Sequence, residues 1–518
     1  MNFIENCKHI FKCFYVDKDT ARFINHNKKV WQKWRCSQNS PVILVDLYEV
    51  GETIISWSYF VNILAKKYHA KIMSFAPPKK VTNFTLRKVY DSFNVTGHIV
   101  TTLTQEQKNR RDTLSQKIIP SIKTKQDLFN FTLLDLWIGI DIYETYLSRF
   151  NKPTIHLDDQ NLIDLIVEGI GLVIFWRDYF SKNKVAAVIV SHDCYMAYNI
   201  ICKIAYRAQI PVYLPNIRGI WLINKPLSVH AYFTHYREMF KKLPKDEQHK
   251  GLALARQQIE KRLNGVVGVD MPYSTKSGFG PANDQVTVLK ESDKIKVLIC
   301  SHCFYDNPHG YGGMIFTDFY EWLVFLGQIS EKTDYDWYLK IHPDPLPGTY
   351  DIIEEILSQF SKIAVIPHET SHHQLVKEGI NFVLTCFGTV GHEYPVLGVQ
   401  VINAAFNPHI AYNFNWHPKS IEEYEHYLLN LGRLEKEIDI NELYEFYYMN
   451  YYYVPADDLF LRSHKESLND PYVKQKVRSG IYRYFLDQLT EEKHQEIINN
   501  IQKYIESGKS HYFSRGPE

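Results

Sequence analysis

The sequence predicts an α/β protein with two Rossmann-like domains that face each other across a cleft and a helical C-terminal tail. Short apolar strands alternate with helical patterns, which is typical of parallel sheets built from βαβ units. The alternation occurs twice, on either side of an aperiodic segment at 268–284 that contains two Pro and three Gly. The chain has 518 residues, of which 45% are hydrophobic, enough for two packed cores.

The first half begins with a clear strand, PVILVD at 41–46, followed by apolar residues at helical spacing from Thr53 to Tyr68. The later elements are predicted in the same way, strands from short apolar runs and helices from apolar residues at helical spacing. We expect strands at 71–75, 185–190 and 211–214, and helices at 161–180 and 195–207.

The second half follows one exposed helix at 244–263, which has Pro near its start and Gly265 after its end. From Ser420 onward the chain is helical, charged and rich in Tyr. The expected strands are 296–300, 337–341, 363–366, 381–385 and 399–402. The predicted domains are a first Rossmann-like domain at 1–240, a linker at 241–292, a second Rossmann-like domain at 293–425 and the tail at 426–518.

Charge and composition exclude several classes of protein. Lys and Arg number 59 against 58 Asp and Glu, so overall charge does not favour a nucleic-acid partner. No signal peptide is expected, and the most apolar window, 162–176, is too short and too charged to cross a membrane. Eight cysteines are too few for a disulfide scaffold and suit a reducing compartment, so we expect a cytoplasmic protein. Cys300 and Cys303 have CxxC spacing, but buried structural thiols are favoured over zinc.

Ligands bind beyond the carboxyl ends of strands in open α/β sheets, so residues just after each strand are the candidates for chemistry. Lys340, His342 and Pro343 end the second strand of the second half. A cationic Lys and an imidazole donor suit a phosphate there. A histidine satisfied by the backbone of a Pro-rich turn is an equally good interpretation.

A second candidate loop follows the strand at 381–385. Gly388 and Thr389 stand between strand and helix, where backbone N–H groups can approach a phosphate. Glu393 is one turn further and can accept hydrogen bonds from a ribose or sugar hydroxyl. The alternative is that Glu393 stabilises the first helical turn. The glycine spacing is not GxGxxG, so a nicotinamide dinucleotide is not expected.

A third loop, from Ser301 to Gly313, separates the first strand of the second half from a helix expected near Met314. His302, Asp306, His309 and Gly310 lie in it, and we expect a flexible loop that contacts the ligand. A metal held by the two histidines and Asp306 is the less favoured interpretation, so no metal and no cofactor are expected.

In the first half, His192 and Asp193 follow the strand at 185–190, where either side chain could act as a general base. Asp193 as the N-cap of the next helix is the alternative that local sequence favours. Glu49, in the loop after the first strand, is the other candidate base.

The second half resembles bacterial capsule and surface-polysaccharide glycosyltransferases of the GT-B fold. It is most similar to enzymes that use CMP-activated ulosonic acids such as Kdo or sialic-type sugars. The resemblance covers about residues 295–430, while the first half matches in architecture. It is carried by the segments DNPHGYGG, IFTDFYEWL, KIHPD, TCFGTVGHEYPVLG, VINAAFNPH and SIEEYEHYL in that order.

The resemblance implies that His342, in the HP motif, contacts the nucleotide phosphate, and that Gly388 and Thr389 occupy the loop that also holds it. Cys386 stands where such enzymes carry a hydroxyl. The general base would be a carboxylate of the first domain, which we place on Asp193, with Glu49 second.

The function implied is transfer of a sugar from a nucleotide-sugar donor to a glycan or lipid-linked hydroxyl in surface-polysaccharide synthesis, at the inner membrane face if the acceptor is a lipid. Two alternatives share the fold: a UDP-sugar 2-epimerase and a CDP-polyol phosphotransferase. A non-enzymatic scaffold of glycan assembly is a third, supported by a 14% aromatic content. We assign the Tyr-rich segment 444–453 to packing of the tail or to a partner contact.

Overall fold

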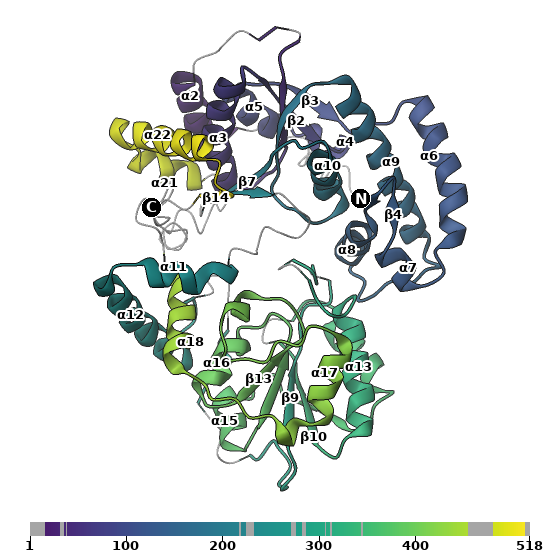
Figure 1. Ribbon diagram of the computed structural model, residues 1–518, viewed down its shortest axis with the longest axis vertical. Coiled ribbons are helices and arrows are strands. Elements are labelled where there is room, and N and C mark those ends of the chain that lie inside the picture. The colour runs from purple at the N-terminus through teal and green to yellow at the C-terminus, as the bar shows by residue number, and fades with distance from the viewer. Residues whose placement is uncertain are drawn as a thin grey trace. The chain divides into compact units, whose positions relative to one another are not determined.

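The computed structural model is a mixed α/β protein whose chain divides into two compact units (Figure 1). It describes residues 16–31, 36–37, 39–216, 219–223, 233–270, 276–281, 286–305, 307–310, 313–342, 345–453 and 480–512. Unit 1 comprises Met1–Thr145, Leu157–Val229 and Val454–Gly516. Unit 2 comprises Tyr146–His156, His230–Tyr453 and Pro517–Glu518. The C-terminal region is therefore divided between the units at Tyr453, and the helix at 245–263 belongs to unit 2.

In the described part of unit 1, the strands form a sheet of order β14-β8-β7-β6-β1-β2-β3. Strands β7, β6, β1, β2 and β3 are parallel, and β8 and β14 add to one edge in antiparallel pairs. The strands are β1 Val42–Asp46, β2 Lys71–Ala76, β3 Val95–Val100, β6 Val185–Ile189, β7 Val212–Asn216, β8 Gly219–Ile223 and β14 His511–Tyr512. The four expected strands of the first half are confirmed, whereas β3, β8 and β14 were not expected.

Helices cover both faces of this sheet (Figure 1). On one face lie α2 Lys18–Val30, α3 Gly51–Tyr68, α5 Phe84–Ser92, α21 Gly480–Gln488 and α22 Glu491–Ser507. On the other, Phe75 of β2 packs its ring against Trp176 of α9, with centroids 5.1 Å apart. The remaining elements between β2 and β7 are α4 Pro78–Val81, α6 Gln105–Ile118, η1 Ile119–Ser121, α7 Lys125–Phe129, β4 Thr132–Leu133, β5 Leu136–Trp137, α8 Gly139–Phe150, α9 Gln160–Lys182 and α10 Met196–Arg207. The last turn of α8, from Tyr146, is assigned to unit 2.

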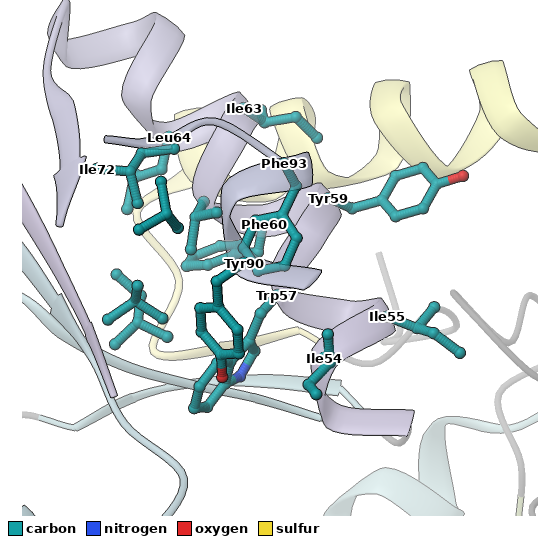
Figure 2. Close-up of a cluster of buried hydrophobic side chains, with 14 of the residues drawn as sticks. Ile54, Ile55, Trp57, Tyr59, Phe60, Ile63, Leu64, Ile72, Tyr90 and Phe93 are labelled. Atoms are coloured by element: carbon teal, nitrogen blue, oxygen red, sulfur yellow. The ribbon is translucent and has the colours of Figure 1, made fainter. Parts of the chain in front are cut away.

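Helix α3 lies at the centre of a hydrophobic core of unit 1, because its middle turns are buried all round. Figure 2 shows Trp57 and Tyr90 side by side beneath Phe60. The Trp57 indole N–H donates to the Pro215 carbonyl of β7 at 2.8 Å, which ties α3 to the sheet. The Tyr59 hydroxyl lies 2.7 Å from Nδ1 of His494 and ties α3 to the C-terminal helix α22. The last helices of the chain therefore complete the core of unit 1.

In the described part of unit 2, five strands form a parallel sheet of order β11-β10-β9-β12-β13. All five strands expected from the second half are confirmed, as β9 Lys296–Cys300, β10 Asp336–Lys340, β11 Ile363–Ile366, β12 Phe382–Thr385 and β13 Gln400–Asn403. Side chains alternate between two cores, one under α13, α14 and α17 and the other under α15 and α16.

The helices of unit 2 are α11 Tyr236–Lys242, α12 Lys245–Leu263, α13 Phe319–Lys332, α14 Thr349–Leu357, α15 His372–Lys377, α16 Val390–Val396, α17 Ile421–Leu429 and α18 Ile440–Tyr447, with the short turns η3 Pro408–Ala411, η4 Leu431–Arg433 and η5 Tyr448–Tyr452. Helix α13 begins at Phe319 rather than near Met314. Asp318 caps it, accepting the Glu321 N–H at 2.7 Å, while Met314 instead makes a single bridge to Ala405.

Both sheets have a switch point, where the chain leaves one strand outward and later returns on its other side. In unit 1 the chain passes from β1 to β2 and β3, then returns beside β1 as β6. In unit 2 it passes from β9 to β10 and β11, then returns beside β9 as β12. The loops after such strand pairs diverge and leave a crevice that binds ligands in open α/β sheets.

Across the described segments, no helix combines the length and the apolar character needed to cross a lipid bilayer.

Replacing Trp57 by Ala is expected to lower the free energy of unfolding by about 3–5 kcal/mol, because it leaves a cavity in the core and an unbonded Pro215 carbonyl. Trp57→Phe keeps most of the ring volume and should lose less. Chemical denaturation followed by circular dichroism measures both. Equal midpoints for the wild type and both variants would show that the packing of α3 does not stabilise unit 1.

Candidate functional site

The switch point of unit 1 carries a buried carboxylate at the end of β1. Asp46 is the last residue of this strand and is 2% exposed. Its Oδ2 accepts a hydrogen bond from the Ser191 hydroxyl, which follows β6, at 2.6 Å. Burial raises the pKa of Asp46 to about 6, although the charge of Lys80 and the bond from Ser191 oppose the shift. A carboxyl group with this pKa can exchange a proton near neutral pH.

His192 extends this contact toward the surface. Its Nδ1 lies 2.9 Å from Oγ of Ser191, and the side chain is half-buried. Burial and the nearby charge of Lys80 lower the pKa of His192 to about 4, so the ring is neutral at physiological pH. A neutral imidazole beside a carboxylate is suited to general-base chemistry.

Lys80 lies on α4, the short helix after β2, so the segments after three neighbouring strands contribute to one cluster. Its Nζ donates to the Tyr198 hydroxyl at 3.1 Å. It also lies 5.6 Å and 5.3 Å from the ring centroids of Tyr48 and Tyr198, within the range of cation–π attraction. Burial opposes the charge of Lys80, but Asp46 and Tyr198 outweigh it and raise its pKa. Lys80 is therefore a fixed positive charge between two tyrosines.

Two local features hold the loops of this cluster. The Tyr90 hydroxyl of α5 accepts the Tyr48 N–H at 2.8 Å and lies 3.0 Å from the Asp46 carbonyl, which fixes the turn after β1. Tyr195, between β6 and α10, has φ of +59°, a backbone region that is costly for a residue other than glycine. The next amide, of Met196, donates to the Thr145 hydroxyl at 3.0 Å.

The structure places all three candidate bases of the first half in this region. Asp193 is 7% exposed and precedes α10, but the N-cap residue of that helix is Tyr195, so the capping interpretation of Asp193 is wrong. An N-cap at Asp193 requires the helix to begin at Cys194, whereas α10 begins two residues later, at Met196. Glu49 is half-buried, and its charge acts on Lys80 and Tyr90. The roles of Asp193, Glu49 and His192 as bases remain predictions.

At the switch point of unit 2, His302 joins the loop after β9 to the loop after β12. Its Nε2 accepts the backbone N–H groups of Cys386 and Phe387, at 3.0 and 3.2 Å, and lies 3.0 Å from the Thr385 hydroxyl. The Gly388 N–H donates to the same hydroxyl at 3.1 Å. Burial lowers the pKa of His302 to about 3, consistent with a neutral ring that accepts these bonds. The first amides of the glycine-containing loop are thus bound within the protein.

Lys340 and His342, expected to act together, point to different partners. Lys340 is 3% exposed, and its Nζ donates to the carbonyls of His368 and Thr370 at 2.6 and 2.7 Å. Burial lowers its pKa to about 8. His342 is exposed beyond β10, close enough to His302 to affect that ring electrostatically. Pro343 lies outside the described residues.

Glu393 and Thr389 both bind Arg262, which the sequence analysis did not single out. Arg262, near the end of α12, donates to Glu393 Oε1 at 2.5 Å, to Asp270 Oδ1 at 2.5 Å and to the Thr389 hydroxyl at 3.2 Å. The Tyr447 hydroxyl bonds the other Asp270 oxygen at 2.9 Å. Burial opposes the charge of Arg262, but Glu393 and Asp270 outweigh it and raise its pKa. This Arg262 cluster anchors the loop after β12 to α12 and to the Tyr-rich segment.

The loop after β9 presents a mixture of buried and accessible residues. His309 is 2% exposed, and its backbone N–H donates to Oδ1 of Asn307 at 3.0 Å. The Gly310 N–H lies 3.4 Å from the Asn307 carbonyl. Asp306 lies outside the described residues. Within the parts of the chain that the structure describes, no three His, Cys, Asp or Glu side chains are grouped to hold a metal ion.

Four further residues join the candidate sites: Asp46, Ser191 and Lys80 in unit 1 and Arg262 in unit 2. Asp46 ends β1, Ser191 comes two residues after β6 and Lys80 four residues after β2, so the strand-end rule applies to them as it does to His192. Arg262 carries no such signal, because its partners are 8 to 131 residues away in sequence.

Comparison with known proteins gives distant likenesses. No protein-family profile and no curated protein matches the chain. Among solved structures it is similar to the β-Kdo 2,4 transferase of Thermosulfurimonas dismutans KpsC, with 13% identity, 51% of this chain and 79% of that chain covered, and a TM-score of 0.26. The UDP-GlcNAc 2-epimerase of Neisseria meningitidis bound to UDP-GlcNAc matches with 13% identity, coverage of 78% and 97%, and a TM-score of 0.21. TM-scores this low do not establish a shared fold.

Replacing Arg262 by Met is expected to destabilise the protein by about 3–5 kcal/mol, because it leaves the buried carboxylates of Glu393 and Asp270 without their cation. Arg256→Met, on the same helix, is the matched control. Its side chain is 68% exposed and, among the described residues, forms its ion pair with Glu260, so little change is expected. Urea unfolding measures both. Equal effects would show that the Arg262 cluster is not a structural anchor.

Asp46 is expected to make stability fall as the pH rises from about 4 to about 6, because its pKa is raised from 3.8 to about 6 on folding. Over this range the folded protein binds the proton more tightly than the unfolded chain. Asp46→Asn should remove this component. The difference between the melting curves of wild type and variant, measured across the range, tests it; a difference independent of pH would refute the raised pKa.

Proposed function

We propose that this protein transfers a sugar from a nucleotide donor to a hydroxyl group of a glycan or glycolipid. The best candidate donor is CMP-activated Kdo or another nonulosonic acid, as the resemblance of the second half implies. The observation that carries the proposal is that each of two parallel sheets gathers ionisable side chains at its switch point, an imidazole and glycine loop in unit 2 and a carboxylate–imidazole cluster in unit 1. One set suits an anionic leaving group and the other suits removal of a proton.

On the donor side, the exposed imidazole of His342 is the proposed contact for the nucleotide phosphate. Lys340 supports it indirectly, because its bonds to the carbonyls of His368 and Thr370 hold the next strand-end loop in place. Gly388 and Thr389 remain the proposed second phosphate contact, for which the Gly388 N–H would exchange its bond to the Thr385 hydroxyl for one to the phosphate. Glu393 remains the proposed sugar or ribose contact. Since Arg262 binds both Thr389 and Glu393, it would set the position of that loop.

On the acceptor side, unit 1 would supply the base that deprotonates the attacking hydroxyl. His192, Asp193 and Glu49 remain candidates, and Asp46 joins them because its pKa is near 6. A base with a pKa close to the working pH combines the correct protonation state with sufficient proton affinity. A lipid-linked acceptor would bring the protein to the inner face of the membrane.

A thermal-shift screen with CMP, CDP, UMP, UDP and GDP tests the donor class. A ligand at 100 times its dissociation constant should add about 2.7 kcal/mol of stability, which is visible as a shift in melting temperature. We expect stabilisation by CMP, lost in His342→Ala. The matched control is His426→Ala, an exposed histidine of α17 outside the site, which should keep the shift.

The other outcomes separate the alternatives. Selective stabilisation by UDP would favour a hexose transferase or a UDP-sugar 2-epimerase, and the epimerase alone would convert a UDP-sugar without an acceptor. Selective stabilisation by CDP would favour a CDP-polyol phosphotransferase. If no nucleotide shifts the melting temperature, the proposed donor site is wrong and a scaffold of glycan assembly is the better interpretation.

A further inference from the structure

A continuous chain of hydrogen bonds links the buried carboxylate of Asp46 to the half-buried imidazole of His192. Ser191 stands between them, with its Oγ 2.6 Å from Asp46 Oδ2 and 2.9 Å from His192 Nδ1. The three residues come from the ends of the two strands that flank the switch point of unit 1. The described residues make no hydrogen bond to the other ring nitrogen, Nε2.

The chemistry of the three groups fixes the direction of these bonds. An ionised carboxylate only accepts, so the single hydroxyl proton of Ser191 must point to Asp46. Ser191 can then only accept from His192, which places the imidazole proton on Nδ1. The lone pair of His192 is therefore on Nε2, the nitrogen at the open end of the chain. When Asp46 is protonated the same contacts permit the reverse order, with the imidazole proton on Nε2.

We propose that Asp46, Ser191 and His192 form a proton relay that activates the acceptor, in which Nε2 of His192 takes the proton of the attacking hydroxyl and Asp46 receives a proton through Ser191. This inference rests on the proposed function and names the base that function requires. His192 is the catalytic residue, since it touches the acceptor, and Ser191 and Asp46 act through it.

The step balances. The acceptor O–H bond breaks, and its electron pair forms the new bond to the anomeric carbon of the donor. The bond from that carbon to the phosphate oxygen breaks, and its electron pair leaves with the nucleotide. The released proton binds Nε2 of His192, the Nδ1 proton moves to Ser191, and the Ser191 hydroxyl proton moves to Oδ2 of Asp46. Return of the proton to water through the same chain restores the starting state.

The surroundings favour Asp46 as the final site of the proton. The pKa of Asp46 is about 6 and that of His192 about 4, so an added proton is more stable on the carboxylate than on the ring. Lys80 contributes to this order, because its charge disfavours a second cation on His192. The ionisable groups around the relay are Lys80 on α4, Tyr48 and Glu49 before α3, Glu52 at the start of α3, Tyr90 on α5, Asp193 and Cys194 between β6 and α10, and Tyr198 on α10.

The rings beside His192 indicate the class of acceptor. Tyr48 and Tyr198 lie against the imidazole, with centroids 5.4 and 5.5 Å from it. The face of a tyrosine ring can pack against the C–H groups of a sugar ring, and its hydroxyl can form a hydrogen bond with a sugar hydroxyl. The relay therefore suits a carbohydrate hydroxyl rather than a simple alkyl alcohol.

Nitrogen NMR of the full-length protein, with ¹⁵N-labelled histidine, tests the relay without any substrate. The two nitrogens of a neutral imidazole give distinct signals, and His192→Gln identifies those of His192. At about pH 7.5 we expect the Nδ1–H form. At about pH 5, below the pKa of Asp46 and above that of His192, we expect the neutral Nε2–H form.

The variants separate a relay from a structural hydrogen bond. Ser191→Ala should abolish the switch between the two forms, and Ser191→Thr, which keeps the hydroxyl, should retain it. His98 is the internal control, because its Nδ1 contacts Ser74 at 2.6 Å while its Nε2 contacts Asp91 at 3.0 Å. Donation to Asp91 predicts the Nε2–H form for His98 at about pH 7.5, in the wild type and in Ser191→Ala alike. Ser74→Ala should leave the signals of His192 unchanged.

The relay is overturned if His192 carries its proton on Nε2 at about pH 7.5, if it passes directly from the Nδ1–H form to the imidazolium, or if Ser191→Ala leaves the switch intact. These results differ from failure of the proposed function. If no nucleotide binds but the tautomer switch is present, the proposed function is wrong and the hydrogen-bonded chain remains. If nucleotide binds but the switch is absent, the relay is wrong and the proposed function remains.

Discussion

The parallel arrangement of neighbouring strands is the constraint on which both units depend. Parallel strands end at one edge of a sheet, so loops that are far apart in sequence meet there. In unit 1 the ends of β6, β1 and β2 bring together Ser191, Asp46 and Lys80. In unit 2 the ends of β9 and β12 bring His302 to the Thr385 hydroxyl and the amides beyond it. The candidate chemistry is a consequence of strand order.

The two units treat buried charge differently. In unit 2, Arg262 has two carboxylate partners and a threonine hydroxyl, so the charges compensate one another. Such a cluster gives rigidity, and removing one member is costly. In unit 1, Asp46 is bound by the hydroxyl and the backbone of Ser191 and is near the charge of Lys80, which also lies over two tyrosine rings. These interactions do not fully offset its burial, so its pKa rises. Incomplete compensation is what keeps a group ready to exchange a proton.

The sequence predicted most of the sheet elements, because a buried parallel strand is an unbroken apolar run. VILVD, KVLIC and FVLT each consist of such a run with one polar residue at an end, and each forms a strand buried along its length. Strand β3 was missed because VTGHIV is only half-buried and contains a glycine. Strand β14 has two residues, too few for any sequence pattern. It is a strand because these two residues pair with β8 in an antiparallel arrangement.

Among the site residues, the strand-end rule located His192 and His342, because position after a strand is visible in the sequence. It did not reveal partners. Glu393 was interpreted as a ligand contact or a helix-stabilising residue, yet its partner is Arg262, 131 residues away. Lys340 ends its strand as expected but turns to two backbone carbonyls, because its side chain is buried rather than aimed beyond the sheet.

By itself, the sequence determined the α/β class, the order of the strands along the chain and the loops in which polar residues concentrate, since local apolar period and turn residues carry that information. Tertiary structure alone decided that Ser191 lies between Asp46 and His192, that Arg262 joins Glu393 to Asp270, and that the last helices complete the core of unit 1. Burial and hydrogen bonding between distant segments set protonation states, and no local pattern encodes them.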